Sequence, residues 1–142
     1  MRIRIPALAA LALAVTLSGV ARAADEALSA ALEKVTRDQI AAFNREDPNA
    51  TMAFAYTKSP AFDKTRAELG PLFKDTDARA EEVDFRFVGH DDEFAVARVK
   101  VKVTSSDAGF EDNIVDTLMI FHTQGGAWKV WDTYVLGSEL VK

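Results

Sequence analysis

Apolar side chains recur every three or four positions in the first half of the chain, a spacing that places them on one face of an α-helix. The pattern predicts a long helix from Asp25 to about Asn44. Two shorter helices are expected after it, because Asp47-Pro48 and Ser59-Pro60 each place a capping side chain before a proline. Gly70-Pro71 is expected to end the third helix. The positions on the apolar face of the first helix are Leu28, Leu32, Val35, Gln39, Ala42 and Phe43.

The period changes to two after Arg79, which predicts strands whose side chains alternate between the two faces of a sheet. Four strands are expected, at Val83–Phe87, Ala95–Val103, Glu111–Thr123 and Trp128–Leu136. The two glycines at positions 125 and 126 suit a tight hairpin turn with positive φ. Helices followed by strands, with no linker or repeat between them, predict one α+β domain with three N-terminal helices packed on a curved antiparallel sheet.

The predicted register, which pairs Phe87 with Ala95 and Met119 with Asp132, gives the sheet two different faces. The inner face, expected to pack against the helices, carries Val83, Phe85, Phe87, Ala95, Ala97, Val99, Val101, Val103, Val115, Thr117, Met119, Phe121, Trp128, Val130, Asp132 and Tyr134. The outer face carries Phe94, Val96, Ile114, Leu118, Ile120, Trp131 and Val135. Because so apolar a surface is rarely left to water, we expect a homodimer to bury the outer face.

The N-terminus has the features of an export signal. Arg2 and Arg4 precede the apolar run Ala7–Leu17, and Ala21-Arg22-Ala23 has the small residues that signal peptidase requires. The sequence therefore predicts a signal peptide at residues 1–23, cleaved after Ala23, and a periplasmic or secreted domain at 24–142. The alternative is a retained membrane anchor, which the short apolar run disfavours. No other segment approaches the apolar length of a membrane span.

The charge balance excludes one class of partner. The chain has 22 acidic and 17 basic residues, and loss of the three arginines of the predicted signal moves the net charge from −5 to −8. Nucleic-acid binding requires a basic surface, so no nucleic-acid partner is expected. The chain has no cysteine, which excludes disulfides and thiolate chemistry.

Few side chains of the chain suit metal binding. His90 and His122 are the only histidines, and their predicted positions, in a loop and near a strand end, do not make a metal site. A cation site at Asp91-Asp92-Glu93 remains as an alternative. Arg98 and Asp116 are expected to form an ion pair on the outer face. The prediction is therefore no metal and no cofactor.

Three segments, in this order, resemble those of a known superfamily. They are a first helix ending in Ala41-Ala42-Phe43-Asn44, a second helix at Asp47-Pro48 that carries Met52 and Tyr56, and a last strand that begins Trp128-Lys129-Val130. The chain resembles the nuclear transport factor 2-like superfamily, especially its SnoaL-like and ketosteroid-isomerase-like branches. The resemblance implies a cone-shaped cavity between helices and sheet, and often a homodimer through the outer sheet face.

The superfamily includes isomerases, cyclases, dehydratases and non-catalytic binders, so the resemblance leaves three functions open. The first is a binding protein for a small, apolar ligand, with the cavity residues Tyr56, Met52, Phe85, Thr117, Met119 and Trp128.

The second function is an enzyme. Many relatives have histidines four and six residues after the tryptophan of the last strand, where this chain has Asp132 and Tyr134. Asp132 would be the general base, and Tyr134 or Tyr56 would donate a hydrogen bond to an oxyanion. The alternative is that Asp132 is only a hydrogen-bonded rim residue. The third function is a non-catalytic interaction module that uses the outer face, with Phe94, Ile114, Leu118, Ile120 and Trp131 at a dimer interface.

Overall fold

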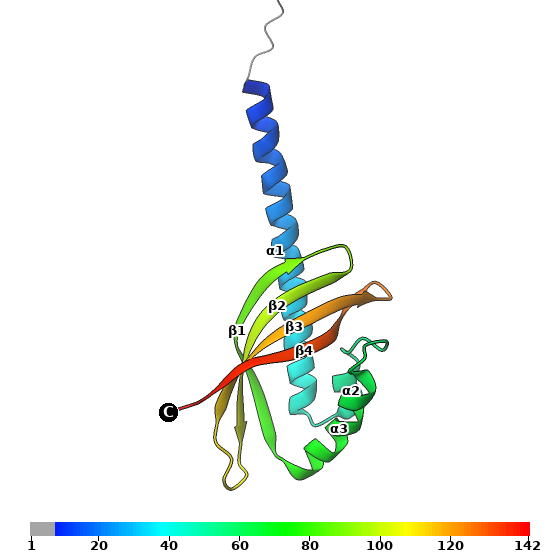
Figure 1. Cartoon of the computed structure of the whole chain (residues 1–142), viewed down its shortest axis with the longest axis vertical. Helices are drawn as coiled ribbons and strands as arrows, with labels where there is room; N and C mark the ends of the chain where they lie inside the picture. The colour runs from blue at the N-terminus through cyan, green and yellow to red at the C-terminus, as the bar shows by residue number, and fades with distance from the viewer. Residues whose placement is uncertain (1–7) are drawn as a thin grey trace, which may run out of the picture.

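The computed structural model describes residues 8–142. Three helices are followed by a single antiparallel sheet with the strand order β1-β2-β3-β4 (Figure 1), so the predicted α+β fold is confirmed. The sheet crosses α1 and curves around it, and its other face carries no helix in this view. The elements are α1 (Leu8–Asn44), α2 (Pro48–Met52), α3 (Phe62–Asp75), β1 (Ala78–His90), β2 (Phe94–Ser105), β3 (Asn113–Gln124) and β4 (Ala127–Leu140).

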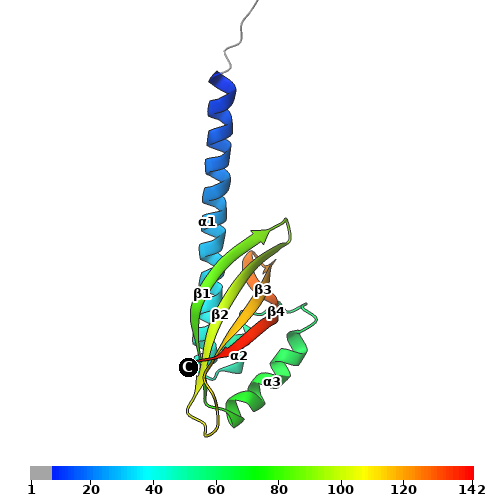
Figure 2. The same ribbon diagram turned by 60° about the vertical axis from the view of Figure 1, so that its left-hand side comes forward.

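Helix α1 is longer than the apolar periodicity predicts, and its first half projects beyond the sheet (Figure 2). It continues without a break through the predicted cleavage site at Ala23, and residues 19–27 are exposed. Arg2 and Arg4 of the predicted signal lie outside the described residues. Within the described part of the chain, no helix combines the length and the apolar character needed to cross a membrane.

The capping prediction holds for α2. The Asp47 carboxylate accepts the Ala50 N–H at 2.9 Å, and Pro48 occupies the first turn. The prediction that Gly70-Pro71 ends α3 is wrong, because the helix continues to Asp75 with Pro71 inside it. Proline lacks only its own N–H bond, and the Thr76 N–H still closes the last turn on the Leu72 carbonyl at 2.9 Å.

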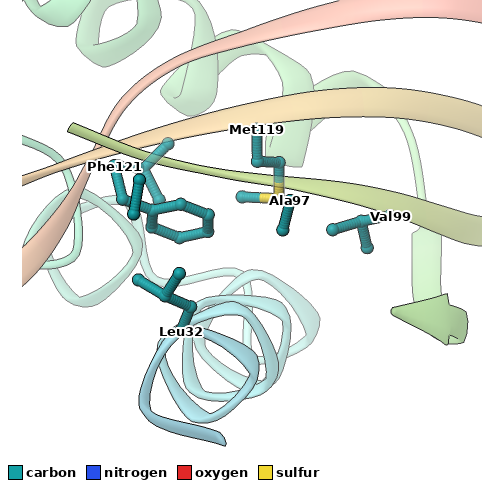
Figure 3. Close-up of a cluster of buried hydrophobic side chains, with 7 residues drawn as sticks. Leu32, Ala97, Val99, Met119 and Phe121 are labelled. Carbon is teal, nitrogen blue, oxygen red and sulfur yellow. The ribbon is translucent and has the colours of Figure 1, made fainter. Parts of the chain in front are cut away.

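The hydrophobic core lies between α1 and the inner face of the sheet. Leu32 projects from α1 toward Phe121, while Ala97, Val99 and Met119 line the sheet above it (Figure 3). Leu32, Ala97, Val99 and Phe121 have no solvent exposure. This packing fills the centre of the predicted cone with side chains.

Between Asp84 and Phe87, the pairing of β1 with β2 differs from the predicted register by two residues, and a bulge lies at each end of this stretch. Phe87 pairs with Ala97 rather than Ala95, because the connecting loop is shorter than expected. A shift of two keeps each side chain on its face, so the predicted faces hold where the strand is regular. A bulge at Val83 breaks that rule: Val83 is exposed, and the preceding Glu82 turns toward α1 instead.

The pairing of β2 with β3 is also shifted by two, so that Asp116 lies opposite Lys100. The predicted ion pair still forms, diagonally: Arg98 Nε donates to Asp116 Oδ1 at 2.8 Å. The Arg98 guanidinium holds the pKa of the Asp116 carboxyl below its ordinary value.

A bulge at Trp131 in β4 changes which side chains face the helices. The hairpin turn is as predicted, with Gly125 and Gly126 at φ 60° and 79° and Phe121 opposite Val130. Beyond the extra residue at Trp131, however, Asp132 lies opposite Ile120 rather than Met119. Because Ile120 belongs to the outer face, the predicted place of Asp132 on the inner face is wrong.

Two further positions of β4 follow from the bulge. Tyr134 pairs with Leu118 and so lies on the outer face, whereas the prediction placed it on the inner face. Val135 pairs with Thr117 on the inner face, so its predicted place among the outer-face residues is wrong.

Candidate functional site

The chain between α2 and α3 is fastened to the edge of the sheet beside β4. The Tyr56 N–H donates to the Val130 carbonyl and the Val130 N–H to the Phe54 carbonyl, both at 2.8 Å. The buried Ser59 hydroxyl donates to the carbonyl of Trp131, the bulged residue. These bonds set the start of α3 against the bulge.

A pocket of about 170 Å³ lies between this fastened segment, α1, α2 and β4. Its lining residues are Gln39, Thr51, Met52, Ala55, Ser59, Ala61, Phe62, Thr65, Val130, Trp131, Asp132 and Thr133. A second hollow of about 380 Å³ shares Gln39, Thr51 and Thr133 with it and reaches Ala80 and Val103. The two together form the part of the inner face that the core leaves open, and we call the first one the α2–β4 pocket.

The α2–β4 pocket is more polar than the sequence suggested. Two of its hydroxyls have protein partners, since Thr51 donates to the Asp47 carbonyl at 2.8 Å and Ser59 donates to Trp131. Within the described residues, the Gln39 amide and the Thr65 hydroxyl make no side-chain hydrogen bond to another protein group. Gln39 was the one polar residue among the positions predicted for the apolar face of α1, and that break in the pattern was the only sequence signal for its role.

The structure brings Asp132 and Tyr134 within hydrogen-bond reach of each other, but Tyr134 lies on the outer face and not on the predicted inner face. Asp132 lines the pocket, and its Oδ1 accepts the Thr133 N–H at 2.8 Å. A hydrogen bond to Asp132 raises the pKa of the Tyr134 phenol above its ordinary value. Tyr134 is 52% exposed, so its hydroxyl lies in water rather than in a dry cavity. The predicted catalytic role of this pair stays a prediction.

The predicted ligand-binding residues are divided among three environments. Met52 lines the α2–β4 pocket. Phe85 and Trp128 pack against the core cluster, and Met119 belongs to it. Thr117 is buried, and its hydroxyl donates to the Val99 carbonyl at 2.9 Å.

Tyr56 lies away from that pocket, in an aromatic cluster with Phe94, His122 and Trp131. Its ring centroid is 4.7 Å from that of His122 and 5.0 Å from that of Trp131. The ring of Phe94 stands edge-on to Trp131, with centroids 5.5 Å apart. Because Phe94 and His122 pair across β2 and β3 on the outer face, the cluster marks one end of that face.

The five predicted dimer-interface residues all lie half-buried in this single chain. They share the outer face with the Arg98–Asp116 ion pair and the aromatic cluster. Ile114, Leu118 and Ile120 lie along β3, and Phe94 lies opposite its end. The outer face is therefore a continuous surface with apolar, aromatic and paired charged groups.

The loop at Asp91-Asp92-Glu93 is organised by backbone hydrogen bonds. Asp91 Oδ1 accepts the N–H groups of Phe94 at 2.7 Å and Glu93 at 2.8 Å, and these bonds lower the pKa of Asp91. The His90 ring lies 3.1 Å from the Asp25 carboxylate. Among the described residues, no group of three His, Cys, Asp or Glu side chains is placed to hold a metal ion.

Glu82 is a buried charge that the sequence did not reveal. Its side chain is 8% exposed, and its Oε1 accepts from Arg37 Nε at 3.0 Å. Its Oε2 is buried and has no hydrogen-bond partner among the described residues. Burial raises the pKa of Glu82, against the opposing effect of Arg37. The bulge at Val83, which no sequence pattern announced, creates this environment.

Comparison with known proteins identifies the family. The family model for the C-terminal domain of anti-sigma-I factor RsgI9 matches residues 34–141, most of the chain and nearly all of the fold described above. The chain belongs to this RsgI9 C-terminal domain family. A search of curated proteins finds no match to the chain.

Solved structures show that this RsgI9 C-terminal domain family member has the fold of nuclear transport factor 2-like proteins, as the resemblance read from the sequence implied. A protein from Novosphingobium aromaticivorans, provisionally assigned as an aromatic ring hydroxylase, has a TM-score of 0.66 at 10% identity, over 80% of this chain and 92% of its own.

Two further structures agree in fold. An uncharacterised protein with a cystatin-like fold from Caulobacter vibrioides has a TM-score of 0.65 at 12% identity, over 79% of this chain and 88% of its own. A nuclear transport factor 2-like protein of unknown function from Shewanella oneidensis has a TM-score of 0.58 at 12% identity, over 73% and 94%. At sequence identities this low, the similarity to these structures shows a shared fold.

Proposed function

We propose that this chain is an exported, non-catalytic domain that binds a small molecule in the α2–β4 pocket. The observation that carries the proposal is the pocket itself, bounded by three helices and an edge strand that hydrogen bonds fasten together. Its volume of about 170 Å³ is close to that of an engineered cavity of about 150 Å³ that holds benzene. A ligand of benzene-like size suits it.

Two observations favour binding over catalysis. The family is named for a domain of an anti-sigma factor and not for an enzyme. Tyr134, the predicted oxyanion donor, is more exposed than buried, so its hydrogen bond would be weakened by water. The alternative is an isomerase-, cyclase- or dehydratase-type enzyme with Asp132 as general base. Asp132 is among the residues that line the pocket, but this alternative requires its carboxylate to turn away from Tyr134 and into the pocket.

A pocket-filling variant tests the binding function. Thr65 is exposed on α3 and lines the pocket, so Thr65→Trp fills the space without disturbing the core. Ala67→Trp adds the same side chain to an exposed α3 position that does not line the pocket. Native mass spectrometry of protein purified from its host should show a retained small molecule in the wild type and in A67W, but not in T65W. Retention by T65W equal to the wild type would contradict the proposal.

The proposal of export rests on the predicted signal peptide. Residues 19–27 are exposed, so the residues on either side of the predicted cleavage site after Ala23 are not part of the core. The intact mass of the protein recovered from the periplasm or medium should correspond to a chain that begins at Ala24. A recovered chain that still carries residues 1–23 would favour the membrane-anchor alternative.

A second candidate function is a homodimeric interaction module that uses the outer face. It is favoured by the half-buried apolar side chains of β2 and β3 that no helix covers in Figure 1. Exposed apolar surfaces of this extent usually mark an interface. The two candidates are compatible, since the α2–β4 pocket lies beside the helices and the outer face lies opposite them.

A further inference from the structure

The α2–β4 pocket and the second hollow meet at three residues that come from three elements. Gln39 of α1, Thr51 of α2 and Thr133 of β4 line both of them. The second hollow, of about 380 Å³, is the larger of the two. Most of the volume that the core leaves open on the inner face therefore lies beyond the α2–β4 pocket, where a longer molecule than benzene has room.

Polar side chains of the second hollow are confined to this junction. Among the described residues that line it, the three shared ones are the only ones with a polar side chain, and the others are Ile40, Phe43, Ala80 and Val103. On the other side of the junction, the apolar wall of the α2–β4 pocket is formed by Met52, Ala55, Phe62 and Val130. The junction thus places polar groups between two apolar ends.

The junction has hydrogen-bonding capacity that the protein leaves unused. The half-buried Gln39 side chain bonds no other protein group within the described residues, and its amide can both donate and accept. The buried Thr51 hydroxyl donates to the Asp47 carbonyl at 2.8 Å, so its oxygen can still accept a hydrogen bond. A polar group that a ligand shields from water loses free energy unless it gains a partner, so the ligand should carry a matching group here.

Neither hollow presents a charged group to a ligand. Among the described residues that line the two, Asp132 is the only one with an ionisable side chain. Its carboxylate is hydrogen-bonded to Tyr134 on the outer face. A charged ligand would lose its hydration without gaining a counter-ion, and the lining therefore favours an uncharged one.

We propose that one ligand spans both hollows: an uncharged, elongated molecule with an apolar group at each end and a hydrogen-bonding group, such as a ketone or ester carbonyl, between them at Gln39. This inference rests on the proposed binding function and adds the chemical class of the ligand. The Gln39 amide donates to the carbonyl, one apolar end lies against Met52 and Phe62, and the other lies against Ile40 and Val103.

Three probes separate the requirement for two apolar ends from the requirement for a polar centre. Benzophenone has two rings joined by a carbonyl, acetophenone has the carbonyl and one ring, and diphenylmethane has the two rings without a polar group. Each is titrated into the purified chain, and its affinity is measured from the NMR shifts of the protein. Benzophenone should bind about tenfold more tightly than acetophenone, because its second ring reaches the second hollow.

Two variants assign these effects to the second hollow and to the junction. Ala80→Trp fills the second hollow, so it should weaken benzophenone binding about tenfold and leave acetophenone binding unchanged. Gln39→Met keeps the length of the side chain and removes its amide, so the ratio of the affinities for benzophenone and diphenylmethane should fall about fivefold. If A80W does not fold, Val103→Trp blocks the same hollow from β2.

The matched control is Ala67→Trp, which adds the same side chain to an exposed α3 position outside both hollows and should keep the wild-type affinities. Equal affinities of the wild type for benzophenone and acetophenone, unchanged benzophenone binding by A80W, or an unchanged affinity ratio in Q39M would overturn this inference and leave the binding function in place. If no probe binds the folded wild-type chain and the purified protein retains no small molecule, both proposals fail.

Discussion

Glu82 shows at the scale of one residue how a bulge turns a surface carboxylate into a buried one. Its Oε2 lacks a partner among the described residues, and burial raises the pKa of Glu82 above its ordinary value of 4.5. The folded chain therefore holds the Glu82 proton more tightly than the unfolded chain does. As the pH rises from about 4.5 through the folded pKa, Glu82 loses its proton and its contribution to stability declines.

Replacement of Glu82 by Gln removes this titration while it keeps an oxygen for Arg37. The free energy of unfolding of Glu82→Gln, relative to the wild type, should rise as the pH is raised through this window. Chemical denaturation at a series of pH values measures it. Glu81→Gln, at the exposed neighbouring position, is the control and should show a smaller dependence. A relative stability of E82Q that falls with rising pH would contradict the assignment.

The N-terminal cap of α2 is a second local interaction whose contribution to stability can be measured. Asp47 accepts the Ala50 N–H, and its carbonyl accepts both the Thr51 N–H and the Thr51 hydroxyl. Asp47→Ala removes the side-chain cap and should lower the free energy of unfolding by about 1 kcal/mol. Asp47→Asn preserves the cap and should differ from the wild type by only a few tenths of that amount. Equal urea midpoints for D47A and the wild type would show that the cap does not stabilise the chain.

At the scale of elements, the sequence predicted which segments are helices or strands, and which side chains face the helices, better than it predicted how the strands pair. Alternation assigned Phe85, Phe87 and Met119 to the inner face correctly, because a shift of two residues does not change a face. A bulge inserts a single residue and reverses the faces beyond it, as for Tyr134 and Val135. The carbonyl of the bulged residue Trp131 accepts a hydrogen bond from Ser59, which is distant in the sequence, and no local pattern predicts such a contact.

In the candidate site too, the residues that follow a local pattern were predicted, and those placed by contacts distant in the sequence were not. Met52 and Asp132 were predicted from the resemblance and the pattern, and both line the α2–β4 pocket. Ser59 and Thr65 were not predicted, because their place in the pocket depends on how the segment after α2 is fastened to β4. Tyr56 was assigned to the second helix and the cavity, but α2 ends at Met52, and the parallel bridge of Ala55 with Val130 is followed by Tyr56 among the outer-face aromatics.

Two glycines in different elements should respond oppositely to alanine. Gly70 lies inside α3, and a Cβ there would meet no atom within 4 Å apart from its chain neighbours and the backbone of its own helix. Gly70→Ala should therefore stabilise the chain by about 0.5–1 kcal/mol. Gly126 has φ of 79° in the hairpin turn, so Gly126→Ala should destabilise it by about 1 kcal/mol. Thermal unfolding of both variants measures the pair, and a shift of the same sign in both would contradict this account of the two positions.

At the scale of the whole molecule, the sheet has one face covered by α1 and one face free of helices (Figure 1). The free face holds Trp131 in an aromatic cluster and the apolar row of β3. In a two-fold dimer, this face would pack against the same face of a second chain. The contact would bury the aromatic cluster and the apolar row of β3 together, because both chains contribute the same patch. The proposed homodimer therefore predicts that the mature chain sediments as a dimer at high micromolar concentration.

Substitution within the outer face tests that dimer. Trp131→Glu should give a soluble monomer or an unstable chain, because it places a charge among the rings of Tyr56 and Phe94. Leu118→Glu removes the dimer without touching that cluster, so a folded L118E monomer separates the loss of association from the loss of folding. Leu72→Glu, on the exposed surface of α3, is the matched control and should remain dimeric. A wild-type chain that sediments as a monomer, with the Trp131 fluorescence unquenched, would overturn the homodimer and leave the outer face without a partner.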